Sequence, residues 1–95
     1  MYGTVFHFQA KPDAADDVKA LFAEWNRDVK PTVDGALNGF LYQLDSDPDR
    51  FIACAVFQDK ASYMKNANSP EQDKWYQRFR DLLTGDPDWN DGQIS

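Results

Sequence analysis

Apolar and polar positions change their spacing along the chain and divide it into strands and helices. Residues 2–10 alternate as a strand does and are rich in valine, threonine and aromatic side chains. The next apolar residues recur at helical spacing and form one stripe: Val18, Leu21, Phe22, Trp25 and Val29. Asp13 stands at the expected N-cap of this helix, with Asp16 three residues later. Pro31 is expected to end the helix, because the residue before a proline avoids the helical conformation.

The second half of the chain contains two further strands, near 39–45 and 50–58, and then a helical zone from about 60 to 84. Asp59 is expected to cap that zone. Ser69-Pro70 interrupts it, which predicts a short helix, a break and a longer helix. The apolar face of the longer helix comprises Trp75, Phe79, Leu82 and Leu83.

The longer helix is expected to stop at Gly85, and Pro87 prevents it from resuming. The tail DWNDGQIS is expected to supply a short fourth strand, with a frayed end as the alternative. The resulting order, βαββαβ, is that of a ferredoxin-like α+β sandwich with the helices on one face of an antiparallel sheet. The length suits one domain, which is predicted over residues 1–95.

The strand FIACAVF, residues 51–57, is apolar on both of its alternations. An antiparallel strand with one face in water should instead alternate apolar and polar side chains. Since the helices can cover only one face of the sheet, a second copy of the chain is expected to cover the other. The pattern therefore predicts a homodimer that packs sheet to sheet.

Composition narrows the class of partner. The net charge is −6 and no basic stripe is present, which disfavours binding to nucleic acid or to an anionic membrane surface. No apolar run approaches the roughly 20 residues of a membrane span, and the start lacks the pattern of a signal peptide. A single cysteine, Cys54, excludes an internal disulfide and fits a reducing compartment. A cytoplasmic location is therefore expected.

His7 is the only histidine and lies between Phe6 and Phe8. Strand alternation places it on one face with Val5 and Gln9, and that face is expected to point at the helices. Neutral imidazole could abstract a phenolic or activated C–H proton, but a histidine in such a place is equally a structural residue. The alternation alone leaves both roles open.

Other chemistries have little support. A lone histidine and a lone cysteine cannot build a zinc cluster, and no glycine-rich loop for phosphate is present, so neither metal nor cofactor is expected. Cys54 lies in an apolar run, which argues for an inert thiol. A polar set near the break in the second helical zone includes Tyr63 and Asn66, three residues apart on one helix face. Trp25, Trp75 and Tyr76 are either core residues or the walls of a pocket.

The chain resembles the antibiotic biosynthesis monooxygenase-like family of dimeric α+β barrel proteins over nearly its whole length. The resemblance rests on three stretches, AKPDAADDVKALFAEW, GFLYQLDSDPDRFIACAVFQDKASY and NANSPEQDKWYQRFRDLL. It implies the same fold and a homodimer. It identifies no single activity, because this scaffold hosts several chemistries.

One branch of the family comprises cofactor-free oxygenases that convert anthrone-like phenols to quinones in a pocket between sheet and helices. The resemblance implies His7 as the base, with Asn66 and Tyr63 as the groups that hold the developing oxyanion. The substrate would contact four further residues: Trp25, Trp75, Tyr76 and Val5.

A second branch degrades haem with an asparagine, a tryptophan and a histidine. This chain has Val5, Asn66 and Tyr76 at those positions, so haem degradation is not expected. Two hypotheses stand: a cofactor-independent monooxygenase, or related enzyme, acting on a small aromatic or polyketide-type molecule, and a non-catalytic homodimer that binds a small apolar molecule or serves as an accessory protein.

Overall fold

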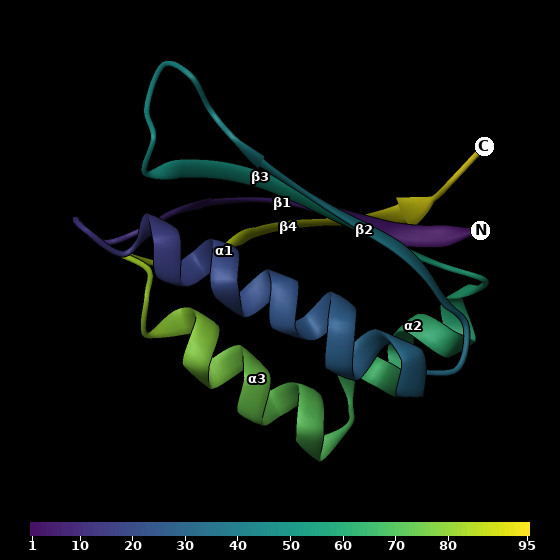
Figure 1. The fold of residues 1–95 in the computed structure, drawn as a ribbon. Helices are drawn as coiled ribbons and strands as arrows, with labels where there is room; N and C mark the ends of the chain where they lie inside the picture. Colours follow the sequence, from purple (N-terminus) through teal and green to yellow (C-terminus); the bar gives the residue numbers. More distant parts are fainter.

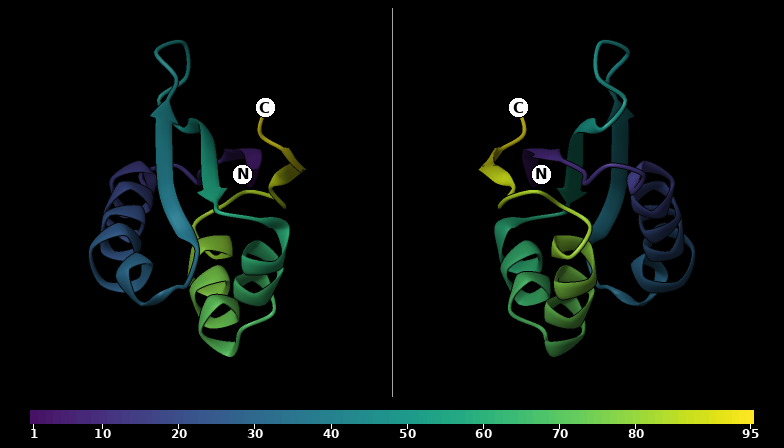
Figure 2. Two further views of the ribbon diagram at one scale, coloured as in Figure 1. Left: turned by 90° about the vertical axis from the view of Figure 1, so that its right-hand side faces the viewer. Right: turned by 90° about the vertical axis from the view of Figure 1, so that its left-hand side faces the viewer.

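A four-stranded antiparallel sheet carries all the helices on one of its faces (Figures 1 and 2). The computed structural model describes residues 1–95. The strands are β1 (Tyr2–Gln9), β2 (Ala36–Gln43), β3 (Arg50–Phe57) and β4 (Asp88–Gln93), in the spatial order β2-β3-β1-β4. The helices are α1 (Ala15–Glu24), α2 (Lys60–Ala67) and α3 (Pro70–Arg80). The ferredoxin-like α+β fold is thus confirmed.

The fourth strand pairs with β1 of its own chain. β4 runs antiparallel to β1, with Phe6 opposite Trp89 and Thr4 opposite Asp91. The tail was expected to supply a strand, and that prediction is confirmed. β1 therefore lies inside the sheet, between β3 and β4.

The core is built around the inner face of β1. Phe8 stacks on Phe51 of β3 with ring centroids 5.3 Å apart, and meets Phe79 of α3 edge to face at 4.8 Å. Phe51 and Phe79 are completely buried. Such rings supply the largest apolar area that a small domain can bury.

The predicted orientation of β1 is wrong. Phe6 and Phe8 are buried against the helices, so His7 between them faces the opposite side of the sheet with Val5 and Gln9. Alternation separates the two sets of side chains but does not say which set faces the core. Two phenylalanines bury more apolar surface than a valine, a histidine and a glutamine, which decides the orientation.

The start of α1 also differs from the prediction. Asp13 has φ +65° and lies outside the helix, and Ala14 occupies the N-cap position without any side-chain hydrogen bond. The backbone N–H of Ala14 instead donates to the Lys11 carbonyl at 3.0 Å, closing a turn. Aspartate tolerates the left-handed region that this turn requires. Asp13 is therefore a turn residue and not a cap.

Helical structure continues past Pro31. After α1, residues Trp25–Val29 form a π-helical turn and Lys30–Thr32 a 3₁₀ turn. Pro31 falls near the start of the 3₁₀ turn, where a backbone donor is not needed. The helix was expected to end at this proline, but it is extended by one turn of different pitch.

The second helical zone breaks where predicted. Asp59 caps α2 by accepting from the Ser62 N–H at 2.8 Å, and Ser69 caps α3 by accepting from the Gln72 N–H at 3.1 Å. α3 ends at Arg80, however, well before Gly85. The following backbone pairs with the end of β1, since the Thr84 N–H donates to the Gln9 carbonyl at 3.0 Å.

No helix covers the outer face of the sheet (Figure 1). Val5, Phe40 and Tyr42 are 44%, 48% and 59% exposed there, and the register places Ile52 and Cys54 beside them. We call these five residues the outer apolar face; Phe40 and Cys54 are also among the residues that line the cavity described below. None of the helices is long and apolar enough to cross a membrane.

We predict that the substitution Phe79→Ala lowers the free energy of unfolding by about 3–5 kcal/mol, because it empties the centre of the aromatic core. Urea unfolding followed by circular dichroism measures the loss. Phe79→Leu is the matched control and should cost clearly less. Equal losses for the two variants would contradict this description of the core.

Candidate functional site

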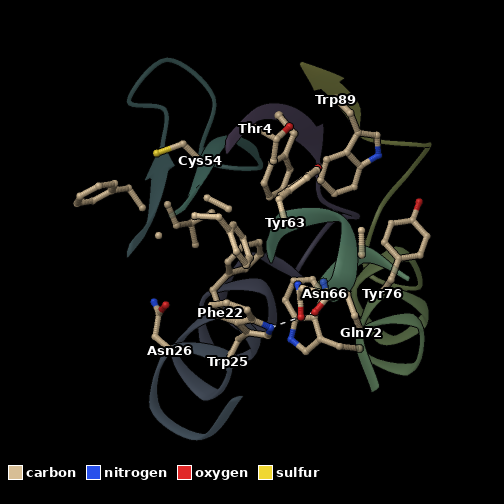
Figure 3. Close-up of a pocket in the computed structure, with 18 of the residues that line it drawn as sticks. Thr4, Phe22, Trp25, Asn26, Cys54, Tyr63, Asn66, Gln72, Tyr76 and Trp89 are labelled. Atoms are coloured by element: carbon tan, nitrogen blue, oxygen red, sulfur yellow. Dashed lines mark hydrogen bonds between the residues drawn. The ribbon is translucent and has the colours of Figure 1, made fainter. Parts of the chain in front are cut away.

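A cavity of about 310 Å³ lies between the inner face of the sheet and the helices (Figure 3). Thirteen of its 19 lining residues are hydrophobic, so it favours an apolar ligand. Its aromatic walls come from every layer of the fold: Phe6, Phe22, Trp25, Trp75, Tyr76 and Trp89. Rings from so many elements can enclose a flat molecule from several sides.

The π-helical turn after α1 places Trp25 and Asn26 at the cavity. The Lys30 N–H reaches back five residues to the Trp25 carbonyl, which widens the helix at this point. Trp25 Nε1 donates to Gln72 Oε1 at 3.2 Å and so joins this turn to α3. Single π-turns within helices are uncommon and often occur at functional sites.

Gly39 of β2 keeps the cavity open beside Asn26. A β-carbon at Gly39 would lie 3.6 Å from Asn26 Oδ1. Both residues line the cavity, so a larger side chain here would fill space that a ligand can use.

The break between α2 and α3 supplies the polar side chains. Tyr63 and Asn66 both line the cavity from α2, as their spacing predicts. The start of α3 contributes Gln72 and Asp73, which follow the Ser69 cap.

Trp75, which lines the cavity, has a buried Nε1 without a hydrogen-bond partner. An unsatisfied buried donor or acceptor costs roughly 1–3 kcal/mol. A polar group of a bound molecule that reached this donor would recover that cost. The site is therefore apolar in its walls but offers hydrogen bonds at defined points.

Tyr63 connects the cavity to an exposed carboxylate. Its Oη donates to Asp91 Oδ1 of β4 at 3.0 Å. Burial, and then the neighbouring carboxylate, raise the pKa of Tyr63 to about 12. The phenol is therefore protonated, and its hydrogen is directed at Asp91.

The structure brings together five of the seven residues assigned to the site from the sequence. Tyr63, Asn66, Trp25, Trp75 and Tyr76 line one cavity. The other two, His7 and Val5, do not line it, because both lie on the outer face of β1.

Sequence reasoning missed several residues of the site, including Thr4, Phe22, Gln72, Trp89 and Asp91. The correct orientation of β1 would have identified Thr4, which shares a face with Phe6 and Phe8. Gln72 and Asp91 carry no local signal, since their roles depend on contacts with residues 47 and 28 positions away. No group of three or more histidine, cysteine, aspartate or glutamate side chains is placed to hold a metal ion.

The sequence model of the family described as antibiotic biosynthesis monooxygenase matches residues 1–78. The chain belongs to this family. The match covers most of the chain and includes the segments that form β1 to β3, α1 and α2, while β4 lies outside it. No curated protein matches the chain in sequence.

Solved structures share the fold across the whole length. A structure described as an antibiotic biosynthesis monooxygenase has a TM-score of 0.78 and 18% identity, covering 100% of this chain and 99% of that chain. A conserved protein from Methanosarcina mazei has a TM-score of 0.84 and 15% identity, covering 99% and 92%. A protein from Mycobacterium tuberculosis has a TM-score of 0.79 and 17% identity, covering 99% and 94%. At such identities the likeness concerns the fold alone.

We predict that ionisation of Tyr63 contributes to loss of stability at high pH. The folded pKa of about 12 lies above the ordinary value of about 10, so the folded state holds this proton more tightly than the unfolded chain. The contribution of the protonated Tyr63 to stability is complete below pH 10 and is lost as the pH rises through 12. Urea midpoints from pH 9 to pH 11.5 should therefore fall more steeply for the wild type than for Tyr63→Phe. Parallel curves would show that folding does not raise the pKa of Tyr63.

Proposed function

We propose that this protein is a cofactor-independent monooxygenase that acts on a small polycyclic phenol. The observation that carries the proposal is a cavity with aromatic walls and several polar side chains, in a chain of the antibiotic biosynthesis monooxygenase family. The substrate would be an electron-rich, flat molecule with an acidic C–H or O–H group, as in anthrone-like compounds.

The aromatic walls support a flat substrate. Phe22 and Trp75 meet edge to face with centroids 5.3 Å apart, so their ring planes are nearly perpendicular. Trp25 is held by its bond to Gln72. Fixed rings of this kind bind planar molecules at little entropic cost.

The polar groups support stabilisation of a developing oxyanion. Asn66 lines the cavity with a side-chain amide, and Trp75 Nε1 is a donor without a partner. Donors held in place before the reaction stabilise charge that forms on a substrate oxygen. We assign Asn66 and Trp75 to this role, with Tyr63 as the third polar contact.

The reaction needs no group other than substrate and oxygen. Loss of a proton from the substrate methylene leaves its electron pair on carbon, and this carbanion reduces molecular oxygen by adding to it. The adduct loses water, so CH₂ and O₂ become C=O and H₂O. The protein binds the ring, assists the deprotonation and stabilises the anion.

We further propose that the protein is a cytoplasmic homodimer. The outer apolar face would be the interface, because its exposed side chains form a continuous apolar surface on three adjacent strands. His7 lies on the same face and would be buried in that interface, a structural role in place of the catalytic one.

Oxidation of 1,8-dihydroxyanthrone in air tests the proposed activity. We expect the wild type to accelerate formation of the quinone, and Asn66→Ala to slow it by about 10²-fold, as loss of an oxyanion donor does in other enzymes. His7→Asn is the control, because His7 lies on the other side of the sheet, and it should retain the wild-type rate. Product is followed by absorbance. Tight binding of the anthrone without product would instead support the non-catalytic binding protein.

Sedimentation velocity tests the dimer. We expect a dimeric wild type and a monomeric Tyr42→Asp variant, because the new carboxylate would be buried without a partner in the interface. Lys65→Asp on α2, outside that face, should stay dimeric. A monomeric wild type at micromolar concentration would contradict the proposed interface.

A further inference from the structure

Asp91 lies outside the cavity but contacts one of its walls. The residue is exposed on β4, opposite Thr4 of β1 in the sheet register. Its Oδ1 accepts the Tyr63 Oη hydrogen at 3.0 Å. The contact joins α2 to the last strand, which lies outside the segment that the family match covers.

Tyr63 is fixed between the cavity and this carboxylate. Its ring packs against Tyr2 at 5.3 Å and meets Phe57 edge to face at 5.4 Å, so the side chain has little freedom to rotate. The phenol has a single hydrogen, and that hydrogen points at Asp91. Oη also receives a hydrogen bond from the side chain of Thr4, which leaves one lone pair to accept a hydrogen from a molecule in the cavity.

We infer that Tyr63 and Asp91 form a proton relay that carries the substrate proton from the cavity to solvent. This inference rests on the proposed function. In the relay the substrate C–H or O–H bond breaks and its electron pair stays on the substrate. Tyr63 Oη takes that proton and passes its own proton to Asp91, which becomes a carboxylic acid and then loses the proton to water.

The environment of Tyr63 favours a relay over a simple base. With its pKa raised to about 12, Tyr63 is not ionised near neutral pH and cannot take a proton unless it gives one away at the same time. Asp91 provides the acceptor, and its exposure lets water remove the proton. Asp91 acts through Tyr63 and is thus a positioning residue that also receives the proton.

One other carboxylate lines the cavity. Asp73 of α3 accepts a hydrogen bond from Gln77 Nε2 at 3.1 Å. Asp73 makes no hydrogen bond to Tyr63, so it represents a separate route for the proton. The experiment has to separate the two.

Hydrogen–deuterium exchange at the methylene of 1,8-dihydroxyanthrone, without oxygen, isolates the proton step. Proton NMR in D₂O follows the loss of the methylene signal. We expect the wild type to accelerate exchange over buffer, and Asp91→Asn to reduce that acceleration by about 10²-fold. Asparagine can still accept from Tyr63 Oη but cannot take up its proton. Tyr63→Phe should show a comparable loss.

The matched control is Asp88→Asn, which removes the same charge from the same strand. Asp88 lies opposite His7, on the other face of the sheet. The Asp88→Asn variant should accelerate exchange of the anthrone methylene as much as the wild type does. Anthrone binding, measured by tryptophan fluorescence, should be unchanged in Asp91→Asn, and Asp91→Glu should recover part of the exchange, neither of which a general loss of structure would give.

The outcomes separate the relay from the oxygenase. Wild-type exchange in Asp91→Asn or in Tyr63→Phe overturns the relay, and loss of exchange in Asp73→Asn alone assigns the proton to Asp73. Exchange that depends on Asp91, without quinone in air, supports the relay and rejects the oxygenase. Quinone formation without accelerated exchange supports the oxygenase and overturns the relay.

Discussion

The burial of Phe6 and Phe8 on one face of β1 is the constraint on which the rest of the site depends. These two rings need the helices as cover, since Phe6 packs against Phe22 of α1 and Phe8 against Phe79 of α3. Once they face the helices, Thr4 must line the cavity and Val5 and His7 must lie outside it. A reversed strand would expose both phenylalanines and bury Gln9.

The cavity exists because the helical layer is interrupted in two places. A straight helix after Glu24 would not present Trp25 and Asn26 from a widened turn, and an unbroken helix from Lys60 to Arg80 would not present both Tyr63 and Gln72 to one space. Each interruption has a sequence feature beside it. Pro31 follows the π-helical turn after α1, and the Ser69-Pro70 cap forms the break between α2 and α3. Elsewhere in the core Val18, Phe51 and Phe79 are fully buried.

The sequence predicts the fold well because spacing and breaks are local properties. The order of elements and the break at Ser69-Pro70 follow from residues within a few positions of one another. The orientation of β1 and the contacts between distant residues are not local properties and cannot be predicted in this way. Which face of β1 is buried depends on the sum of apolar areas across the sheet, and the bond between Tyr63 and Asp91 joins residues 28 positions apart. Residues that reach the site through long-range contacts, such as Gln72 and Asp91, are therefore less predictable than Tyr63 and Asn66, which share one face of a short helix.

The last strand, β4, contributes two residues to the site that lie outside the segment matched by the family model. Trp89 stacks near Phe6 with centroids 4.4 Å apart and closes one side of the cavity, while Asp91 on the same strand holds Tyr63. Since alternate residues of a strand point to the same face, a pair spaced by two can supply both an apolar wall and a polar contact to one cavity. A relative with the same first three strands but a different tail would keep the fold and the helical walls. It would lose this wall and this carboxylate together.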